Sequence, residues 1–228
     1  MPIDIPSPVT SSWGLRALCF DLDNTLYDRD AAAHAVFTRW LADAPPGAPG
    51  MDEVLERDAE GYSDRLGFFE WLGAALGQSG LWPRYQEELP QCATLTEEAR
   101  AILELLRARR VPRAILTNGG PLQRLKIAAL GLEEFIPGRC ILVSGELGVD
   151  KPDPRAFAAV CHVLDLPPEA ILFVGDHPEY DVGGARKAGF RTCWLRRGCQ
   201  DESPDADLAT NSLADLTTLA ATIPANGS

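Results

Sequence analysis

The sequence predicts an α/β fold in which a doubly wound parallel sheet forms the core and a helical segment is inserted near its beginning. Short apolar runs alternate with amphipathic helical patterns through residues 93–228, as expected for parallel strands joined by helical crossovers. Some of these runs, such as ILFV at 171–174, are apolar throughout, which is typical of strands covered on both faces. Residues 29–92 break the alternation, because they contain helical patterns and no clear strand.

The ends of the core helices carry the residue types that begin and end helices. Thr96 fits the N-cap position of one helix, and Gly131 and Gly189 stand just beyond the ends of two others. The apolar runs and helical periodicities then predict the remaining boundaries. The expected strands are 15–20, 113–117, 140–144, 171–174, 191–195 and a short one near 207–209, and the expected helices are 96–110, 121–130, 154–164, 179–188 and 213–222.

The segment 29–92 is predicted to be a separate helical domain inserted into the core. A Pro- and Gly-rich loop at 45–50 separates its first two helical patterns. An insertion on a connecting loop costs little closure entropy, so the core can tolerate it. The predicted core domain therefore comprises residues 1–28 and 93–228. The expected helices of the insert are 30–43, 51–65, 66–78 and 82–88.

Composition and charge exclude several classes of function. The formal net charge of −12 over 228 residues repels a phosphate backbone, so we expect no nucleic-acid partner. No apolar run reaches the roughly 20 residues that span a bilayer, and residues 1–14 lack the basic and apolar regions of a secretion signal. A cytoplasmic protein without a membrane partner is therefore expected. Three histidines and no CxxC pair argue against a zinc site.

Acidic and polar residues follow the predicted strands at the points where the strands end. The carboxyl ends of parallel strands meet at one edge of the sheet, where ligands of open α/β sheets bind. Several carboxylates in one place repel one another unless a cation joins them, and all-oxygen ligands suit Mg²⁺. A metal and a lysine would also let an acidic protein hold an anionic substrate. These residues are Asp21, Asp23, Thr117, Asn118, Lys151, Asp176 and Asp181.

The spacing of these residues favours phosphoryl transfer. Asp21 and Asp23 are two apart, so in an extended segment they face the same side. One carboxylate can then attack phosphorus while the other transfers protons. Thr117 and Asn118 can hold phosphoryl oxygens, and Lys151 can neutralise the charge that gathers on them.

Four segments resemble the motifs of the haloacid dehalogenase (HAD) superfamily, in that family's order: FDLDNTLYD, ILTNGG, GVDKPDP and VGDHPEYDVGGARKAG. The resemblance implies that Asp21 is the nucleophile and Asp23 the acid/base. It implies that Thr117 and Lys151 hold the phosphate. It also implies that Asp21, the backbone carbonyl of Asp23 and Asp176 bind Mg²⁺, with Asp181 in support through water. Residues 29–92 match the place and size of the family's helical type I cap.

The expected function is hydrolysis of small phosphate monoesters by a magnesium-dependent phosphatase through an aspartyl-phosphate. Candidate substrates are a nucleotide, a sugar phosphate or phosphoglycolate, and the enzyme is expected to be a monomer or homodimer. Family members that cleave carbon–halogen bonds lack the second aspartate of the first motif, so Asp23 disfavours a dehalogenase. A phosphomutase of the same fold and a catalytically silent binding or regulatory protein remain alternatives.

Overall fold

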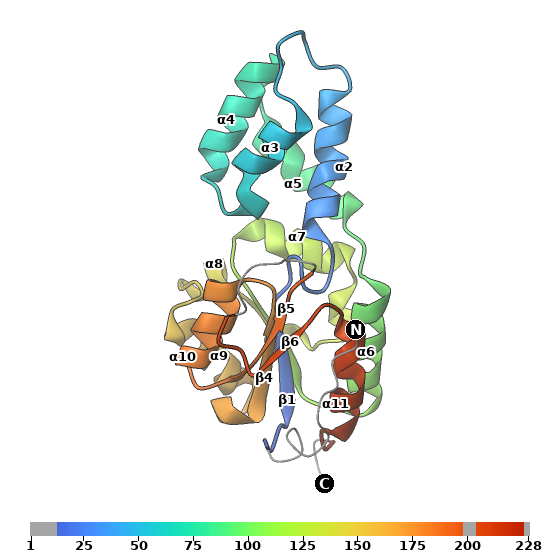
Figure 1. The fold of residues 1–228 in the computed structure, drawn as a ribbon, viewed down its shortest axis with the longest axis vertical. Helices are drawn as coiled ribbons and strands as arrows, with labels where there is room; N and C mark the ends of the chain where they lie inside the picture. The colour runs from blue at the N-terminus through green and yellow to red at the C-terminus, as the bar shows by residue number, and fades with distance from the viewer. Residues whose placement is uncertain (1–12, 198–203, 226–228) are drawn as a thin grey trace. The chain divides into compact units, whose positions relative to one another are not determined.

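The computed structural model describes residues 13–197 and 204–225 (Figure 1). The chain divides into two compact units. Residues Asp28–Thr94 form one unit, and the described residues before and after this segment form the other. The sequence analysis proposed a core of residues 1–28 and 93–228 and an insert of residues 29–92. Among the described residues, no helix has both the length and the apolar character that crossing a bilayer requires.

The larger unit is built on a six-stranded, fully parallel sheet with the order β3-β2-β1-β4-β5-β6. The chain runs outward from β1 to β3, then returns beside β1 with β4 and runs outward in the other direction. This reversal between β1 and β4 is the switch point of a doubly wound sheet, so the predicted fold class is confirmed. The strands are β1 (Ala17–Phe20), β2 (Arg113–Thr117), β3 (Ile141–Val143), β4 (Ile171–Gly175), β5 (Arg191–Leu195) and β6 (Leu208–Thr210).

Helices cover both faces of this sheet, which is why its central strands are apolar throughout. Figure 1 shows α6 and α11 on one side and α9 and α10 on the other. All residues of β1 and β4 are buried. On one face Phe157 packs edge-to-face against Phe173 and Phe190. The helices of this unit are α6 (Glu97–Ala108), α7 (Pro121–Ala129), α8 (Ser144–Leu147), α9 (Pro154–Leu164), α10 (Gly184–Lys187) and α11 (Thr217–Thr222).

The smaller unit contains four α-helices around an aromatic core, with a buried ion pair beside it. Arg29 and Asp58 are both almost fully buried and form a salt bridge. Tyr85 accepts a hydrogen bond from Arg29 at 3.0 Å, so the charged pair has further partners, as buried charges require. The helices are α2 (Arg29–Leu41), α3 (Met51–Asp58), α4 (Arg65–Leu76) and α5 (Leu81–Cys92), and the core rings are Phe37, Trp40, Phe68, Phe69 and Tyr85.

Three helices differ from their predicted forms. The helix expected over 51–65 ends at Asp58, because Ala59 adopts a left-handed backbone with φ of 47°. The helix expected over 179–188 begins as a π-turn, η5 (Pro178–Gly183), and the one over 213–222 begins as a 3₁₀ turn. Residue periodicity near 3.6 does not distinguish these tighter and wider turns from an α-helix.

Candidate active site

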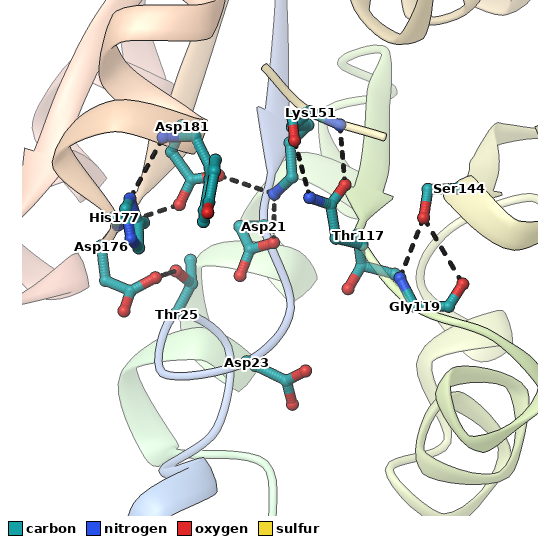
Figure 2. A network of polar contacts seen from close by, with 12 residues as sticks. Asp21, Asp23, Thr25, Thr117, Gly119, Ser144, Lys151, Asp176, His177 and Asp181 are labelled. Atoms are coloured by element: carbon teal, nitrogen blue, oxygen red, sulfur yellow. Dashed lines mark hydrogen bonds and ion pairs between the residues drawn. The ribbon is translucent and has the colours of Figure 1, made fainter. Parts of the chain in front are cut away.

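The carboxyl edge of the sheet brings together the residues expected there (Figure 2). Asp21 directly follows β1, Thr117 ends β2, and Asp176 directly follows β4. Lys151 lies in the loop between α8 and α9. Because β1 lies between β2 and β4, residues far apart in the sequence meet at the switch point of the sheet.

Lys151 is the cation at the centre of this group. Its ammonium nitrogen lies 2.5 Å from Oδ1 of Asp21 and 2.6 Å from Oδ1 of Asp181. Its side chain is only 3% exposed. Burial alone would lower the pKa of Lys151, but Asp181 and Asp21 outweigh burial and raise that pKa above its ordinary value. The residue therefore remains a positive charge at neutral pH.

Three carboxylates next to this ammonium form a possible metal site. One oxygen from each of Asp21, Asp176 and Asp181 lies within 4.8 Å of the others. Burial raises the pKa of Asp21 from 3.8 to about 7, against the opposing effect of Lys151. Burial and then repulsion from Asp181 and Asp21 raise the pKa of Asp176 well above its ordinary value. Such a set of crowded oxygen ligands fits a divalent hard cation such as Mg²⁺, which would replace the protons.

Asp181, which the resemblance assigns to support through water, belongs to this cluster beside Asp21 and Asp176. Its Oδ2 accepts a hydrogen bond from the backbone N–H of His177 at 3.0 Å. Asp176 in turn lies 3.5 Å from the Thr25 hydroxyl, which donates to it. Asp176 and Asp181 are thus both oriented by neighbouring groups.

Asp23 lies at the same edge but faces other partners. Figure 2 shows its carboxylate turned away from those of Asp21 and Asp176. Lys126 contacts both Asp23 oxygens at 2.7 and 2.8 Å, Gln123 donates at 2.9 Å, and the Tyr27 hydroxyl also donates. Burial acts to raise the pKa of Asp23, but Lys126 and the donated hydrogen bonds outweigh it and lower that pKa. Asp23 is therefore a carboxylate in this structure.

The two residues of the second motif differ in what they contact. The Asn118 amide donates to the backbone carbonyl of Lys151 at 2.9 Å and accepts from its backbone N–H at 2.8 Å. Asn118 thus holds the loop that carries Lys151. The Thr117 hydroxyl accepts from Gln123 at 2.6 Å, and the Gly119 N–H donates to the Ser144 hydroxyl at 2.9 Å. Thr117 therefore contacts a side chain of α7, whereas Asn118 contacts the backbone of the loop that carries Lys151.

Lys126 and Gln123 have no place in the four motifs, and the sequence analysis missed both. They lie on α7, where Gln123, Lys126 and Ile127 are the buried residues. Their spacing of three and four residues is that of a helix face turned to the core. Polar residues at such positions are rarely buried without a partner. A glutamine and a lysine on the buried face of a helix that follows the second motif were the available signal.

His177 directly follows Asp176 and has a structural role. Its Nδ1 accepts hydrogen bonds from the backbone N–H groups of Glu179 and Tyr180, both at 3.1 Å. Its ring stacks on Tyr180 with 4.2 Å between centroids. Since Nδ1 is an acceptor, the imidazole is neutral here, and burial lowers the pKa of His177 in the same direction. The residue caps the π-turn that carries Asp181.

Comparisons with known proteins agree with this fold. A family model described as haloacid dehalogenase-like hydrolase matches residues 15–189. A phosphoserine phosphatase from Thermus thermophilus is 39% identical over 248 aligned positions, covering 89% of this chain and 98% of that protein. A phosphoglycolate phosphatase from Chromobacterium violaceum is 31% identical, covering 89% and 95%. The crystal structure of the HAD hydrolase YfnB from Bacillus subtilis has a TM-score of 0.73 at 24% identity, covering 90% and 98%.

The match to the family model extends over more than half of the chain, and the relatives align over nearly all of it. The chain belongs to the haloacid dehalogenase-like hydrolase family. The family predicted from the four motifs is therefore confirmed. The prediction of an enzyme of the phosphatase class is confirmed as well, since the two relatives described above, which align over most of the chain, are both named phosphatases.

Proposed function

We propose that this enzyme hydrolyses small phosphate monoesters in a magnesium-dependent reaction through an aspartyl-phosphate on Asp21. The observation that carries the proposal is the position of Asp21. One of its oxygens contacts the Lys151 ammonium, and its carboxylate belongs to the cluster with Asp176 and Asp181. A nucleophilic carboxylate between a fixed cation and a metal site suits attack on an anionic phosphate.

Each residue of the site then has a defined task. An Asp21 oxygen attacks phosphorus, and the bond between phosphorus and the leaving oxygen breaks with its electron pair on that oxygen. Beside the anionic phosphate, the Asp23 carboxylate takes up a proton from solvent and gives it to the leaving oxygen. The carboxylate that is left later accepts a proton from the water that cleaves the acyl-phosphate. Thr117 and Lys151 contact the phosphoryl oxygens, while Asn118 holds the Lys151 loop by the two hydrogen bonds described above.

The carboxylate cluster supports a set of metal ligands. Asp21, Asp176 and Asp181 would hold Mg²⁺ through their side chains, and the backbone carbonyl of Asp23, which the family resemblance implies, would complete the protein ligands. When bound, the ion neutralises charge that develops on the transferring phosphoryl group. The Asp23 side chain would take no part in coordination, because its oxygens are held by Lys126, Gln123 and Tyr27.

The relatives narrow the substrate class. Phosphoserine and phosphoglycolate, named for the two relatives described above, are both small phosphate monoesters that carry a carboxylate. We therefore place phosphorylated small carboxylic acids ahead of nucleotides and sugar phosphates. A further relative, from Pyrococcus furiosus, is named a glyceraldehyde 3-phosphate phosphatase and is 30% identical. That substrate has the same size without the carboxylate, so it provides a matched comparison.

The function is tested by phosphate release from a panel of phosphorylated metabolites, with Mg²⁺ and with EDTA. We expect inorganic phosphate from phosphoserine or phosphoglycolate with Mg²⁺, and less from glyceraldehyde 3-phosphate. EDTA should abolish release. Isomer formation without phosphate release would instead indicate a phosphomutase. Turnover of no compound in either condition would contradict the proposal.

Binding of Mg²⁺ should stabilise the protein much more at pH 8 than at pH 5.5. The raised pKa of Asp21, about 7 against 3.8, means that the metal-free folded protein keeps a proton that the unfolded chain has lost. The contribution of this group to stability therefore falls between about pH 4 and 7, and Mg²⁺ competes with the proton only weakly below pH 6. At pH 8 and about 100 times its Kd, the ion should contribute about 2.7 kcal/mol.

This pH dependence is measured as the thermal shift between EDTA and Mg²⁺ at the two pH values. Asp176→Asn should lose most of the shift at pH 8. The exposed Asp43→Asn removes the same charge elsewhere and should keep it. A shift of equal size at both pH values would show that these carboxylates do not hold the ion.

A further inference from the structure

The carboxylate of Asp23 accepts hydrogen bonds from three side chains. The Lys126 ammonium bridges both oxygens at 2.7 and 2.8 Å, Gln123 donates to Oδ2 at 2.9 Å, and Tyr27 donates to Oδ1. Charge-assisted hydrogen bonds of this kind are the strong ones in proteins. Four donated bonds on two oxygens fix the rotation of the carboxylate as well as its position.

Packing alone does not account for Lys126. The sequence has three lysines, and Lys126 is only 4% exposed. Lysine is among the residues that are almost never buried unless paired. An apolar side chain would fill this position on the inner face of α7 without the cost of desolvating an ammonium. The ion pair with Asp23 is what distinguishes lysine from such a residue.

Gln123 links this carboxylate to the phosphate-binding side of the site. Its amide nitrogen donates both to Asp23 at 2.9 Å and to the Thr117 hydroxyl at 2.6 Å. Gln123 and Lys126 are three residues apart on α7, so they project from the same side of the helix. Helix α7 thus orients both Asp23, which lies just beyond β1, and Thr117, which ends β2.

We propose that Lys126 is a positioning residue of the reaction, which with Gln123 fixes Asp23 in the orientation used for proton transfer and keeps its side chain out of the metal cluster. The inference rests on the proposed function, in which Asp23 transfers protons. Without Lys126, the Asp23 side chain would lose both of its closest ionic contacts. It could then rotate toward the metal ligands, where it cannot serve the leaving oxygen.

The test compares Lys126→Met on two substrates of different leaving-group quality. The comparison uses kcat/KM, which reports the steps up to departure of the leaving group and not the later cleavage of the acyl-phosphate. Proton transfer to the leaving oxygen matters for an alkyl phosphate such as phosphoserine, so kcat/KM should fall about 10- to 100-fold there. p-Nitrophenolate leaves without a proton, so kcat/KM for p-nitrophenyl phosphate should fall less than about threefold. In an Asp23→Asn background, Lys126→Met should change kcat/KM for phosphoserine by less than about twofold, since both changes remove the same function.

Lys187→Met removes an exposed lysine from α10 and should leave both substrates unaffected. Equal losses on the two substrates, or additive losses in the Asp23→Asn background, would overturn the positioning role. A crystal structure of Lys126→Met gives an independent measurement, in which we expect the Asp23 carboxylate to turn. An unchanged carboxylate would overturn the inference. Absence of phosphatase activity in the wild type would contradict only the proposed function, because the crystal structure still decides the orientation.

Discussion

Asp21→Asn should lower kcat for phosphate release by about 10⁴-fold or more, as expected when the nucleophile of a double-displacement enzyme is removed. The amide has no oxygen basic enough to attack phosphorus. The fold should persist, because Lys151 keeps its contact with Asp181 at 2.6 Å and the asparagine oxygen can still accept from Lys151. Steady-state phosphate release and the melting temperature measure the two effects separately.

A direct measurement supports the kinetic one. Acid-quenched wild-type enzyme should carry one phosphoryl group on the peptide that contains Asp21, and neither Asp21→Asn nor Asp21→Ala should carry it. The alanine variant guards against activity restored by deamidation of the asparagine. Asp43→Asn, on an exposed position, is the matched control and should retain full activity. Phosphorylation of another residue, or substantial turnover by the alanine variant, would rule out Asp21 as nucleophile.

Lys151→Met should lower kcat by about 10²- to 10³-fold, the range found when one group that stabilises transition-state charge is removed. It should also destabilise the metal-free protein by about 3 kcal/mol at pH 8, because two buried carboxylates lose their counter-charge. The deficit should shrink at pH 5, where Asp21 and Asp176, whose pKa values are raised, take up protons. Added Mg²⁺ should also reduce this loss of stability at pH 8, because the ion supplies a counter-charge for the buried carboxylates.

The two readouts are kinetics and thermal or denaturant unfolding, each measured beside Lys187→Met. That control removes a lysine that is exposed on α10 and should match the wild type in both. If Lys151→Met retains kcat within tenfold, the ammonium does not act on the phosphoryl group. If its stability is equally low at both pH values, the loss comes from packing and not from unpaired carboxylates.

The positions of Asp21, Thr117 and Asp176 at strand ends could be predicted because strand identity is largely local. The buried runs around them are apolar without interruption, and a parallel sheet must place their carboxyl ends on one edge. Asn118 shows where this reasoning stops. It also stands at a strand end, directly after β2, yet its amide binds the backbone of Lys151, 33 residues away. No local pattern encodes that direction.

The direction of the Lys126 side chain could not be predicted from the sequence either. Helical spacing alone leaves open whether a lysine three residues after Gln123 points to solvent or to the core, and lysines are usually solvated. The structure resolves the question through contacts over 103 residues to Asp23. The left-handed backbone at Ala59, which ends α3 early, was likewise invisible, because neither a glycine nor a proline marks the position.

By itself, the sequence determined the fold class, and it predicted the division into core and insert and the residues at the carboxyl edge of the sheet. These follow from apolar periodicity and strand ends, which depend on neighbours a few residues away. Only the tertiary structure decided the strand order, the inclusion of Asp181 in the carboxylate cluster and the pairing of Asp23 with Lys126. Those features depend on where distant segments meet and which way their side chains turn. Packing and charge compensation select them only once the chain has folded.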